Sequence, residues 1–397
     1  MLPATPKFIF YSDIPPLGNE GVSMSVLAHR IIASVEDHTH AVITRANGRK
    51  YPRHDIGKNL KPPTWISWDC SGLGLKFLPN SLRHWTDRRL LYIWAHTVGQ
   101  RLLPASSHRT NELVGLSGPH WQFLPRLRTL AHALKLPYSV YIIDDYETTA
   151  ANQGASVGEL GRIRNEIKQC LQSAARVFAI CPGMAERLQK LYGVSSRLLY
   201  PVADTPPTLL PHSSPINHGE IVYIGALGQP YLDSLLQVAE ILERHPTKAW
   251  RLKIIAQDRK SYVRHFTRFR TVIPCHGCDR VTLRQEVARA EIVLVPYAFA
   301  SAWQVTAETS FPSKFIDALT SLKPALIFAP DYASISRHLH AANLGFCAHT
   351  EEVLIDLLDH RPWANDLGWV TGYQALFSLY HSPSAASAEL QKEITSV

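Results

Sequence analysis

The sequence predicts an α/β protein built from two doubly wound parallel sheets, one in each half of the chain. Apolar runs with strand composition alternate with helical patterns along most of the chain, as in βαβ units. Residues 201–219 interrupt this alternation, because they are rich in Pro and Ser and lack hydrophobic periodicity. A chain of 397 residues is also long for one hydrophobic core and natural for two domains.

The first half opens with the apolar run KFIFYS, which predicts a strand over residues 7–12. A loop with Pro and Gly follows, and apolar residues at helical spacing predict a helix over 22–34. The other strands expected in this half are 40–44, 64–68, 138–144 and 175–181. Three helices are expected: one at about 121–134, one between the strands 138–144 and 175–181, and one at 184–192. Elements of these lengths predict a parallel sheet with helical crossovers.

The same alternation restarts after the Pro-rich stretch. Strands are expected at 219–225, 250–256, 271–275, 290–297 and 325–329, with helices at 231–244, at 282–289 and from residue 315 onward. Pro324 ends the last of these helices. We therefore expect a first domain over 1–204, a linker over 205–218, a second domain over 219–365, and a partly helical tail over 366–397 that packs on the first domain.

The composition favours a protein with anionic partners. The formal net charge is +8 and the pI is about 9.1, with basic residues clustered at 45–50, 83–89 and 259–270. Nucleotides and phospholipid surfaces suit this excess. Nucleic acid is not expected, because the sequence has no helix-turn-helix pattern, RNA-binding signature or basic tail. With 46% hydrophobic residues, no apolar run near the roughly 18 residues of a membrane span and no signal-peptide pattern, we expect a cytoplasmic protein.

Six cysteines are scattered along the chain, and reduced thiols are expected. Cys275 and Cys278 have the spacing of metal ligands. No second Cys pair or His pair completes a set of four, so we expect structural thiols and no metal site.

The segment FPSKFIDAL marks a helix that begins at Pro312, Ser313 and Lys314. Proline suits the first positions of a helix and serine its cap. Free amides and the helix dipole favour an anion at such a start, and the ammonium of Lys314 adds positive charge. The alternative is an ordinary cap with a solvated lysine.

Four motifs occur in an order and spacing that resemble a known family: VFAICPGMAERLQKLYG at 177–193, IVYIGAL at 221–227, EIVLVPY at 291–297 and FPSKFIDALTSLKPALI at 311–327. They resemble the GT-B glycosyltransferases of the group 1, or family 4, type. The resemblance implies two Rossmann-like domains facing a cleft. It also implies a metal-independent hexosyltransferase without a cofactor, which moves a sugar from a nucleoside diphosphate to a hydroxyl group.

The resemblance places the donor nucleotide in the second domain, at Gly225, Tyr297, Ser313, Lys314 and Asp317. Ser313 and Lys314 would neutralise the diphosphate. Asp317 lies three residues after Lys314, on the same helix face, and would accept hydrogen bonds from the ribose hydroxyls. An ordinary first-turn carboxylate is the alternative for Asp317.

Two departures from the family pattern concern the same region. The acid that the family often places near the transferred sugar would stand at Thr309, whereas this chain has Glu308 one residue earlier. We expect either that Glu308 takes this place or that the sugar contact differs. Ala226 replaces the family's usual arginine after the glycine, so Lys314 would carry more of the phosphate charge.

The first domain supplies the candidate acceptor side. Gly18 and Gly21 lie in the loop after the first strand, where glycines let the backbone approach a ligand; an ordinary turn is the alternative. His120 lies beyond a strand end and could contact sugar or phosphate, or be a surface or core histidine. Asp144 and Asp145 end a buried strand, where one could bind acceptor hydroxyls or act as a base. A pair that caps a helix is the alternative.

We therefore predict a glycosyltransferase of polysaccharide or glycolipid biosynthesis, with a nucleotide sugar and a carbohydrate or lipid-linked acceptor as partners. A nucleotide-sugar epimerase and a catalytically silent binding protein of the same fold are the alternatives. The run 82–94 combines Arg83, Arg88 and Arg89 with Trp85 and other apolar residues, as in segments that lie on anionic membranes. An ordinary helix with a buried apolar face is the alternative there.

Overall fold

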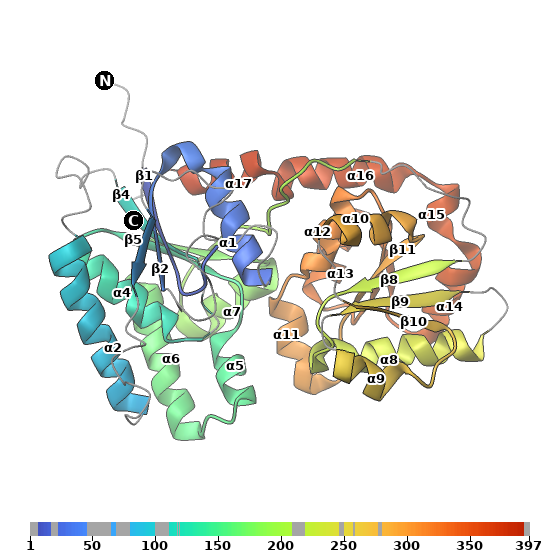
Figure 1. Cartoon of the computed structure of the whole chain (residues 1–397), viewed down its shortest axis with the longest axis horizontal. Coiled ribbons are helices and arrows are strands. Elements are labelled where there is room, and N and C mark those ends of the chain that lie inside the picture. Colours follow the sequence, from blue (N-terminus) through green and yellow to red (C-terminus); the bar gives the residue numbers. More distant parts are fainter. Residues whose placement is uncertain are drawn as a thin grey trace. The chain divides into compact units, whose positions relative to one another are not determined.

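The computed structural model describes residues 7–16, 23–45, 65–68, 80–99, 111–116, 118, 120–208, 219–245, 250–256, 259–276 and 280–392. The internal contacts divide the chain into two units (Figure 1). The first comprises Met1–Tyr200 and Pro383–Val397, and the second comprises Pro201–Ser382. The expected domain limits remain a prediction, and residues 209–218 of the expected linker lie outside the described residues.

The first unit contains a seven-stranded parallel sheet with the strand order β3-β2-β1-β4-β5-β6-β7. The strands are β1 (Lys7–Ser12), β2 (Thr39–Arg45), β3 (Trp65–Trp68), β4 (Asn111–Leu116), β5 (Tyr138–Ile142), β6 (Arg176–Ala179) and β7 (Arg197–Leu198). Residues Phe8 to Tyr11 of β1 are fully buried, because β1 lies inside the sheet with neighbours on both sides.

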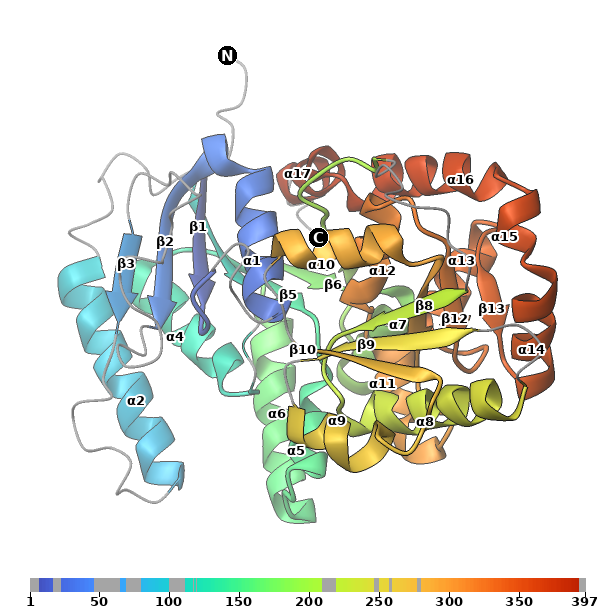
Figure 2. The same cartoon turned by 45° about the vertical axis from the view of Figure 1, so that its right-hand side comes forward.

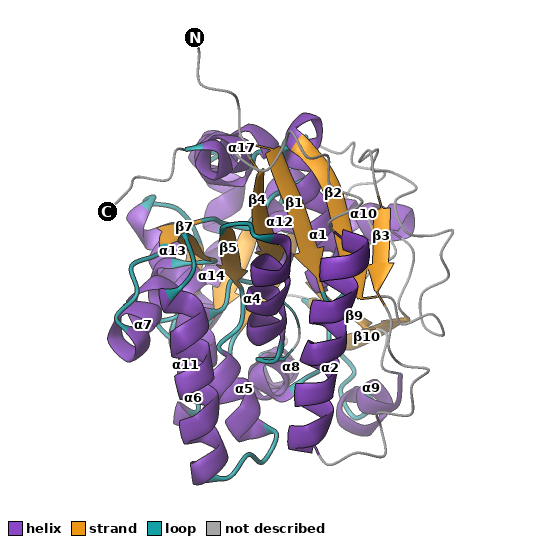
Figure 3. Ribbon diagram, turned by 90° about the vertical axis from the view of Figure 1, so that its left-hand side faces the viewer, coloured by secondary structure: helices purple, strands orange, loops and turns teal. Residues whose placement is uncertain are grey.

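The helices of the first unit connect these strands. They are α1 (Ser23–Ser34), η1 (Glu36–His38), α2 (Asn80–Trp94), η4 (Ala95–Gly99), α4 (Phe123–Leu134), α5 (Tyr146–Asn152), α6 (Val157–Gln172), α7 (Pro182–Tyr192) and the last helix of the chain, α17 (Pro383–Gln391). Helix α4 lies between α2 and α6 (Figure 3). Helix α17 packs against α1, and thereby joins the C-terminal segment to the first unit.

The single helix expected between β5 and β6 is two helices, α5 and α6. Gly154 adopts a left-handed φ of 88°, which ends the first helix, and Ser156 begins the second with a capping box. The Glu159 side chain accepts a hydrogen bond from the Ser156 amide at 2.9 Å. Both signals are local, so the sequence contains the reason for the break.

The second unit contains a six-stranded parallel sheet with the order β10-β9-β8-β11-β12-β13. The strands are β8 (Glu220–Ile224), β9 (Arg251–Ala256), β10 (Val272–His276), β11 (Ile292–Pro296), β12 (Ala325–Phe328) and β13 (Phe346–Ala348). The strand order reverses between β8 and β11. Ligands bind at such a switch point, beyond the carboxyl ends of the strands.

Helices cover both faces of this sheet, with α8 and α9 on one face and α10 and α12 on the other (Figure 2). The helices are α8 (Gln229–Arg244), α9 (Arg259–Phe266), α10 (Arg280–Arg289), η6 (Ser301–Trp303), α11 (Gln304–Thr309), α12 (Ser313–Thr320), α13 (Ser334–Ala341), α14 (Glu351–His360), α15 (Pro362–Asn365), α16 (Gly368–Leu376) and η7 (Phe377–His381). Leu235, Leu252 and Leu294 are fully buried in the core that the sheet shares with these helices.

Candidate functional site

The candidate donor site of the second unit is built around Lys314, which lies in the first turn of α12. Only 7% of this residue is exposed, although its side chain carries an ammonium group. The Nζ atom lies 3.9 Å from the ring centre of Tyr231, in the first turn of α8, and 5.1 Å from that of Tyr223, near the end of β8. Within the described part of the chain, the Lys314 ammonium forms no ion pair. A buried cation at a helix start, with rings as its neighbours, is a site suited to an anion.

Burial determines the charge of this lysine. Removal from water lowers the pKa of Lys314 from 10.5 to about 8, and the negative charge of Asp317 opposes part of that shift. Lys314 is therefore mostly protonated at neutral pH, but loses its proton far more easily than a surface lysine. An anion that enters the site would stabilise the charged form.

The loop after β8 brings the backbone close to the lysine. Gly225 has a left-handed φ of 135°, which side chains other than glycine rarely permit. A Cβ atom at this position would come within 3.1 Å of Lys314 Cε. Gly225 is therefore required by the backbone conformation and by the space that Lys314 occupies. Ala226, where the family resemblance led us to look for an arginine, is exposed.

The other expected donor residues lie around this lysine in different ways. Ser313 is exposed at the first position of α12, and Asp317 is half-buried one turn later. The Tyr297 ring contacts that of Tyr231 at 5.6 Å between centres, and its hydroxyl lies 2.9 Å from Ser310 Oγ. All three expected residues thus belong to the elements that converge on Lys314.

Glu308 and Thr309 occupy the last two positions of α11 and differ in exposure. Thr309 is buried, and its hydroxyl donates a hydrogen bond to the Val305 carbonyl at 2.6 Å. Glu308 is half-buried and accepts a hydrogen bond from Gln304 Nε2 at 2.7 Å. A carboxylate therefore lies beside the position where the family pattern places one, while the hydroxyl of Thr309 is used within its own helix.

In the first unit, the two adjacent aspartates after β5 have separate environments. Asp145 caps α5, because its Oδ1 accepts a hydrogen bond from the Thr148 amide at 2.6 Å, and it pairs with Arg187. Its capping role is the alternative considered from the sequence. Burial raises the pKa of Asp144, and the charge of Asp145 raises it further. Of the two, Asp144 is the better candidate for a proton acceptor, since a raised pKa suits that task.

His120 is exposed between β4 and α4, and its carbonyl accepts a hydrogen bond from the Phe123 amide at 3.0 Å. Gly18 and Gly21 lie outside the described residues. His120 is thus a surface histidine in the loop after β4, which is one of the alternatives considered from the sequence, and its role in a site stays a prediction.

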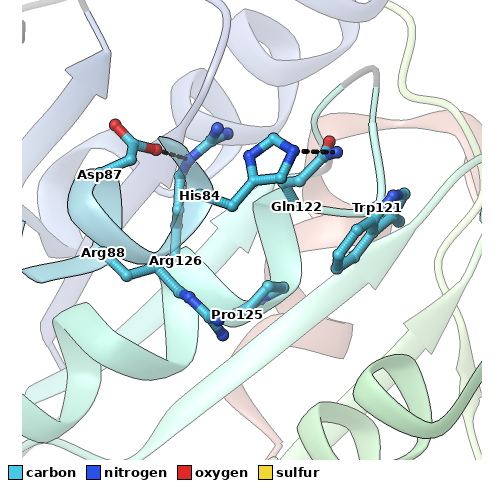
Figure 4. A pocket seen from close by; sticks show the side chains of 7 residues that line it. All are labelled: His84, Asp87, Arg88, Trp121, Gln122, Pro125 and Arg126. Carbon is cyan, nitrogen blue, oxygen red and sulfur yellow. Dashed lines mark hydrogen bonds and ion pairs between the residues drawn. The ribbon is translucent and has the colours of Figure 1, made fainter. Parts of the chain in front are cut away.

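A pocket between α2 and α4 was not predicted (Figure 4). Its cavity volume is only about 10 Å³, room for about one water molecule, and it is lined by His84, Asp87, Arg88, Trp121, Gln122, Pro125 and Arg126. The His84 and Gln122 side chains meet, with their Nε2 atoms 3.3 Å apart. Burial lowers the pKa of His84, and the positive charge of Arg83 lowers it further, so the ring presents a neutral hydrogen-bonding group.

Arg126 organises the base of this pocket. Its Nε donates a hydrogen bond to Asp87 at 2.7 Å, and its Nη1 donates one to Asp13, directly after β1, also at 2.7 Å. The Tyr11 hydroxyl donates to the same Asp13 carboxylate at 2.6 Å. Arg126 lies on the buried side of α4 with Phe123, Leu127 and Leu130, and this position is the local sequence signal for the network.

No cluster of three or more His, Cys, Asp or Glu side chains that could hold a metal ion occurs among the residues with described positions. Cys275 is half-buried in β10, and Cys278 lies outside the described residues. None of the described helices is long and apolar enough to cross a membrane.

Two doubly wound α/β units in succession are the architecture of the GT-B fold. No family model matches the chain, and no curated protein matches its sequence. Solved structures match over nearly the whole length. Sucrose-phosphate synthase from Thermosynechococcus elongatus is 11% identical with a TM-score of 0.69, and the match covers 97% of each chain.

Two further structures agree with this result. HepE from Anabaena, in complex with UDP and glucose, is 13% identical with a TM-score of 0.63, over 99% of this chain and 100% of HepE. The lipopolysaccharide outer core galactosyltransferase WaaB is 14% identical with a TM-score of 0.61, over 97% of this chain and 98% of WaaB. These likenesses show that the chain has the GT-B fold, and they confirm the fold class predicted from the sequence.

Proposed function

We propose that this protein is a glycosyltransferase that moves a sugar from a nucleoside diphosphate donor to a hydroxyl group. The observation that carries the proposal is the buried Lys314 ammonium, which forms no ion pair with any described residue. A buried cation without an ion pair is costly unless an anion uses it. The GT-B fold and its glycosyltransferase neighbours support a donor diphosphate as that anion.

In the proposed reaction, the acceptor hydroxyl forms a bond to the anomeric carbon and loses its proton to a base. The bond between that carbon and the diphosphate oxygen breaks, and the electron pair leaves with the diphosphate. Lys314 and the first amides of α12 stabilise the charge that develops there. We propose Asp144 as the first candidate for the base and Asp145 as the second. Glu308 is the proposed acid near the transferred sugar, and His120 a proposed contact to sugar or phosphate.

The donor class can be tested with a thermal-shift panel of UDP, GDP, ADP, CMP and their sugar conjugates. UDP conjugates come first, since HepE was solved with UDP and glucose. A glycosyltransferase should be stabilised by one nucleoside diphosphate and should slowly hydrolyse its sugar conjugate. An epimerase would convert the donor without an acceptor, and a silent binding protein would leave it unchanged. Absence of any nucleotide-induced shift would contradict the proposal.

The affinity for a nucleoside diphosphate should depend on pH through Lys314. The ligand binds the protonated lysine, whose pKa in the free protein is about 8. Affinity should therefore be constant below about pH 8 and fall as pH rises above it, by up to about tenfold per unit. Calorimetry between pH 6.5 and 9.5 measures this fall. The matching nucleoside is the control for ionisation of the base, and an equal fall for both ligands would contradict the assignment.

Asp317→Asn should weaken binding of ribose nucleotides about 3- to 30-fold, because a hydrogen bond to a charged group contributes about 1.5–3 kcal/mol and the amide retains part of it. The substitution should weaken binding of the 2′-deoxynucleotide much less than that of the ribonucleotide, since the deoxynucleotide lacks one of the hydroxyls that would bond to Asp317. The melting temperature of the ligand-free protein should change little, because Asp317 is only half-buried. Loss of stability with unchanged affinity would show that Asp317 has a structural role.

The first unit is the proposed binding side for the acceptor, whose hydroxyl group belongs to a carbohydrate or a lipid-linked precursor. The pocket between α2 and α4 combines the Trp121 ring with the neutral side chains of His84 and Gln122. An aromatic face and neutral hydrogen-bonding groups suit contact with one edge of a sugar ring, since the pocket itself has room for about one water molecule. We further propose that the enzyme is cytoplasmic and needs neither a metal ion nor a cofactor. Its product would belong to polysaccharide or glycolipid biosynthesis.

Helix α2 supports a contact with an anionic membrane, although with fewer residues than the sequence indicated. Leu91 is buried, and Arg88 pairs with Glu166 at 3.3 Å. In contrast, Leu82, Trp85 and Ile93 are 46%, 58% and 50% exposed, and Arg89 is exposed with them. The only acid in this helix, Asp87, is buried. An apolar, cationic helix face is suited to an anionic interface.

The protein should float with anionic liposomes at low salt, and less at high salt or with neutral liposomes. Trp85→Ser with Arg89→Glu should abolish flotation without loss of stability, because both side chains are exposed. Arg268→Glu, an exposed charge change in the second unit, is the matched control. Failure of the unmodified protein to bind anionic liposomes at low salt would favour a soluble acceptor.

A further inference from the structure

The surroundings of the Lys314 ammonium are aromatic rather than acidic. Two neutral rings face it from the other elements of the site, Tyr231 from α8 and Tyr223 from β8. Burial holds the pKa of Tyr223 well above its ordinary value, so that phenol stays uncharged. The carboxylate that acts on Lys314 is Asp317, one turn further along its own helix. A ring face therefore takes the place that a carboxylate has beside most buried cations.

Tyr231 is the closer ring, and its position is fixed by the backbone. Its amide donates a hydrogen bond to the Gly228 carbonyl at 3.0 Å, and the Ala298 amide donates one to the neighbouring Pro230 carbonyl at 2.8 Å. The ring also packs against that of Tyr297. These contacts tie the first turn of α8 to the end of β11. The ring is thus held where it meets the ammonium, while the residue stays half-exposed.

We propose that Tyr231 is a positioning residue for phosphate recognition: its ring holds the Lys314 ammonium charged and in place at the start of α12 until the diphosphate binds. This inference rests on the proposed donor site. A carboxylate in the same place would neutralise the lysine and compete with the phosphate. A ring attracts the cation without supplying a negative charge, so the full charge stays available to the ligand.

The ring and the hydroxyl of Tyr231 can be separated by two substitutions. Tyr231→Leu keeps an apolar side chain but removes the ring, so Lys314 should lose its proton at lower pH. Affinity for UDP and for inorganic pyrophosphate should fall about 3- to 20-fold at pH 8, with little change for uridine. Tyr231→Phe retains a ring and should stay within about threefold of the unmodified protein. Tyr262→Leu, which removes a buried ring from α9 of the same unit, is the matched control.

A second measurement follows the lysine without any ligand. NMR of protein with ¹³C-labelled lysine, with the Lys314 signal identified by its loss in Lys314→Met, should show a lower titration midpoint in Tyr231→Leu than in Tyr231→Phe. An unchanged midpoint and unchanged pyrophosphate affinity in a folded Tyr231→Leu variant would overturn the inference. If the unmodified protein binds no pyrophosphate or nucleotide, phosphate recognition and the proposed donor site both fail. If the protein binds them but Tyr231→Leu has no effect, the inference about Tyr231 alone fails.

Discussion

Replacing Lys314 by methionine is expected to weaken nucleoside diphosphate binding about 10- to 100-fold, because a charge-assisted hydrogen bond contributes about 1.5–3 kcal/mol. Nucleoside binding should change little, since a nucleoside has no phosphate group for the ammonium to contact. Transfer activity should fall at least as far, since in the proposed reaction the same charge stabilises the leaving diphosphate. Calorimetry with nucleoside and nucleoside diphosphate, combined with a donor-hydrolysis assay, measures these effects.

The same substitution should raise the melting temperature of the ligand-free protein. The pKa of Lys314 is about 8 in the folded state and 10.5 as a free side chain, so burial disfavours the charged form below about pH 10. The free energy of unfolding should therefore increase by at most about 3 kcal/mol at pH 7 in Lys314→Met, and by less at pH 9.5. Lys253→Met is the control, because that lysine pairs with Glu220 and Glu286 and its loss should destabilise the protein. A loss of stability in Lys314→Met together with an equal loss of affinity for both ligands would show that the lysine is structural.

Arg176→Met is expected to destabilise the first unit by about 3–5 kcal/mol, because it leaves the buried Glu112 carboxylate without its partner. The Arg176 guanidinium also donates hydrogen bonds to the carbonyls of Leu390 and Lys392, at 2.6 and 3.0 Å. The substitution should therefore release the C-terminal segment as well. Hydrogen exchange of peptides from β4, β6 and α17 measures both effects, which is preferable to a single unfolding midpoint in a protein of two units.

Two variants make this expectation specific. Adding Glu112→Gln to Arg176→Met should recover part of the loss, since no buried charge then remains unpaired. Arg268→Met breaks an exposed pair with Glu240 and should change stability by less than about 1 kcal/mol. If Arg176→Met changes stability as little as Arg268→Met does, the Arg176–Glu112 pair does not hold the C-terminal segment in place.

Much of the candidate donor site could be predicted, because its signals are local. The helix start at Ser313 and Lys314 is marked by Pro312, and Gly225 stands directly after an apolar strand. Residues after the strands of a doubly wound sheet meet at one edge, so the strand pattern also brought Tyr297 to this region. The break between α5 and α6 has an equally local signal in Gly154 and Ser156, although helical periodicity alone predicts one helix there.

The network below the pocket of the first unit could not be predicted in this way. Arg126 meets Asp13 and Asp87 from two other elements, and periodicity shows only that Arg126 lies among apolar neighbours of its helix. The choice of partner depends on how α2 and α4 pack beside β1. That packing is a property of the assembled unit.

The sequence by itself determined the alternation of strands and helices, hence two doubly wound sheets, and the helix start that bears Lys314. These features follow from periodicity, capping and turn residues, which act over a few neighbouring positions. Only the tertiary structure decided that Lys314 is buried against Tyr231 and Tyr223 rather than solvated or paired with an acid. The reason is physical: the charge of a buried group depends on every group packed around it, and those groups come from strands and helices far apart in the chain.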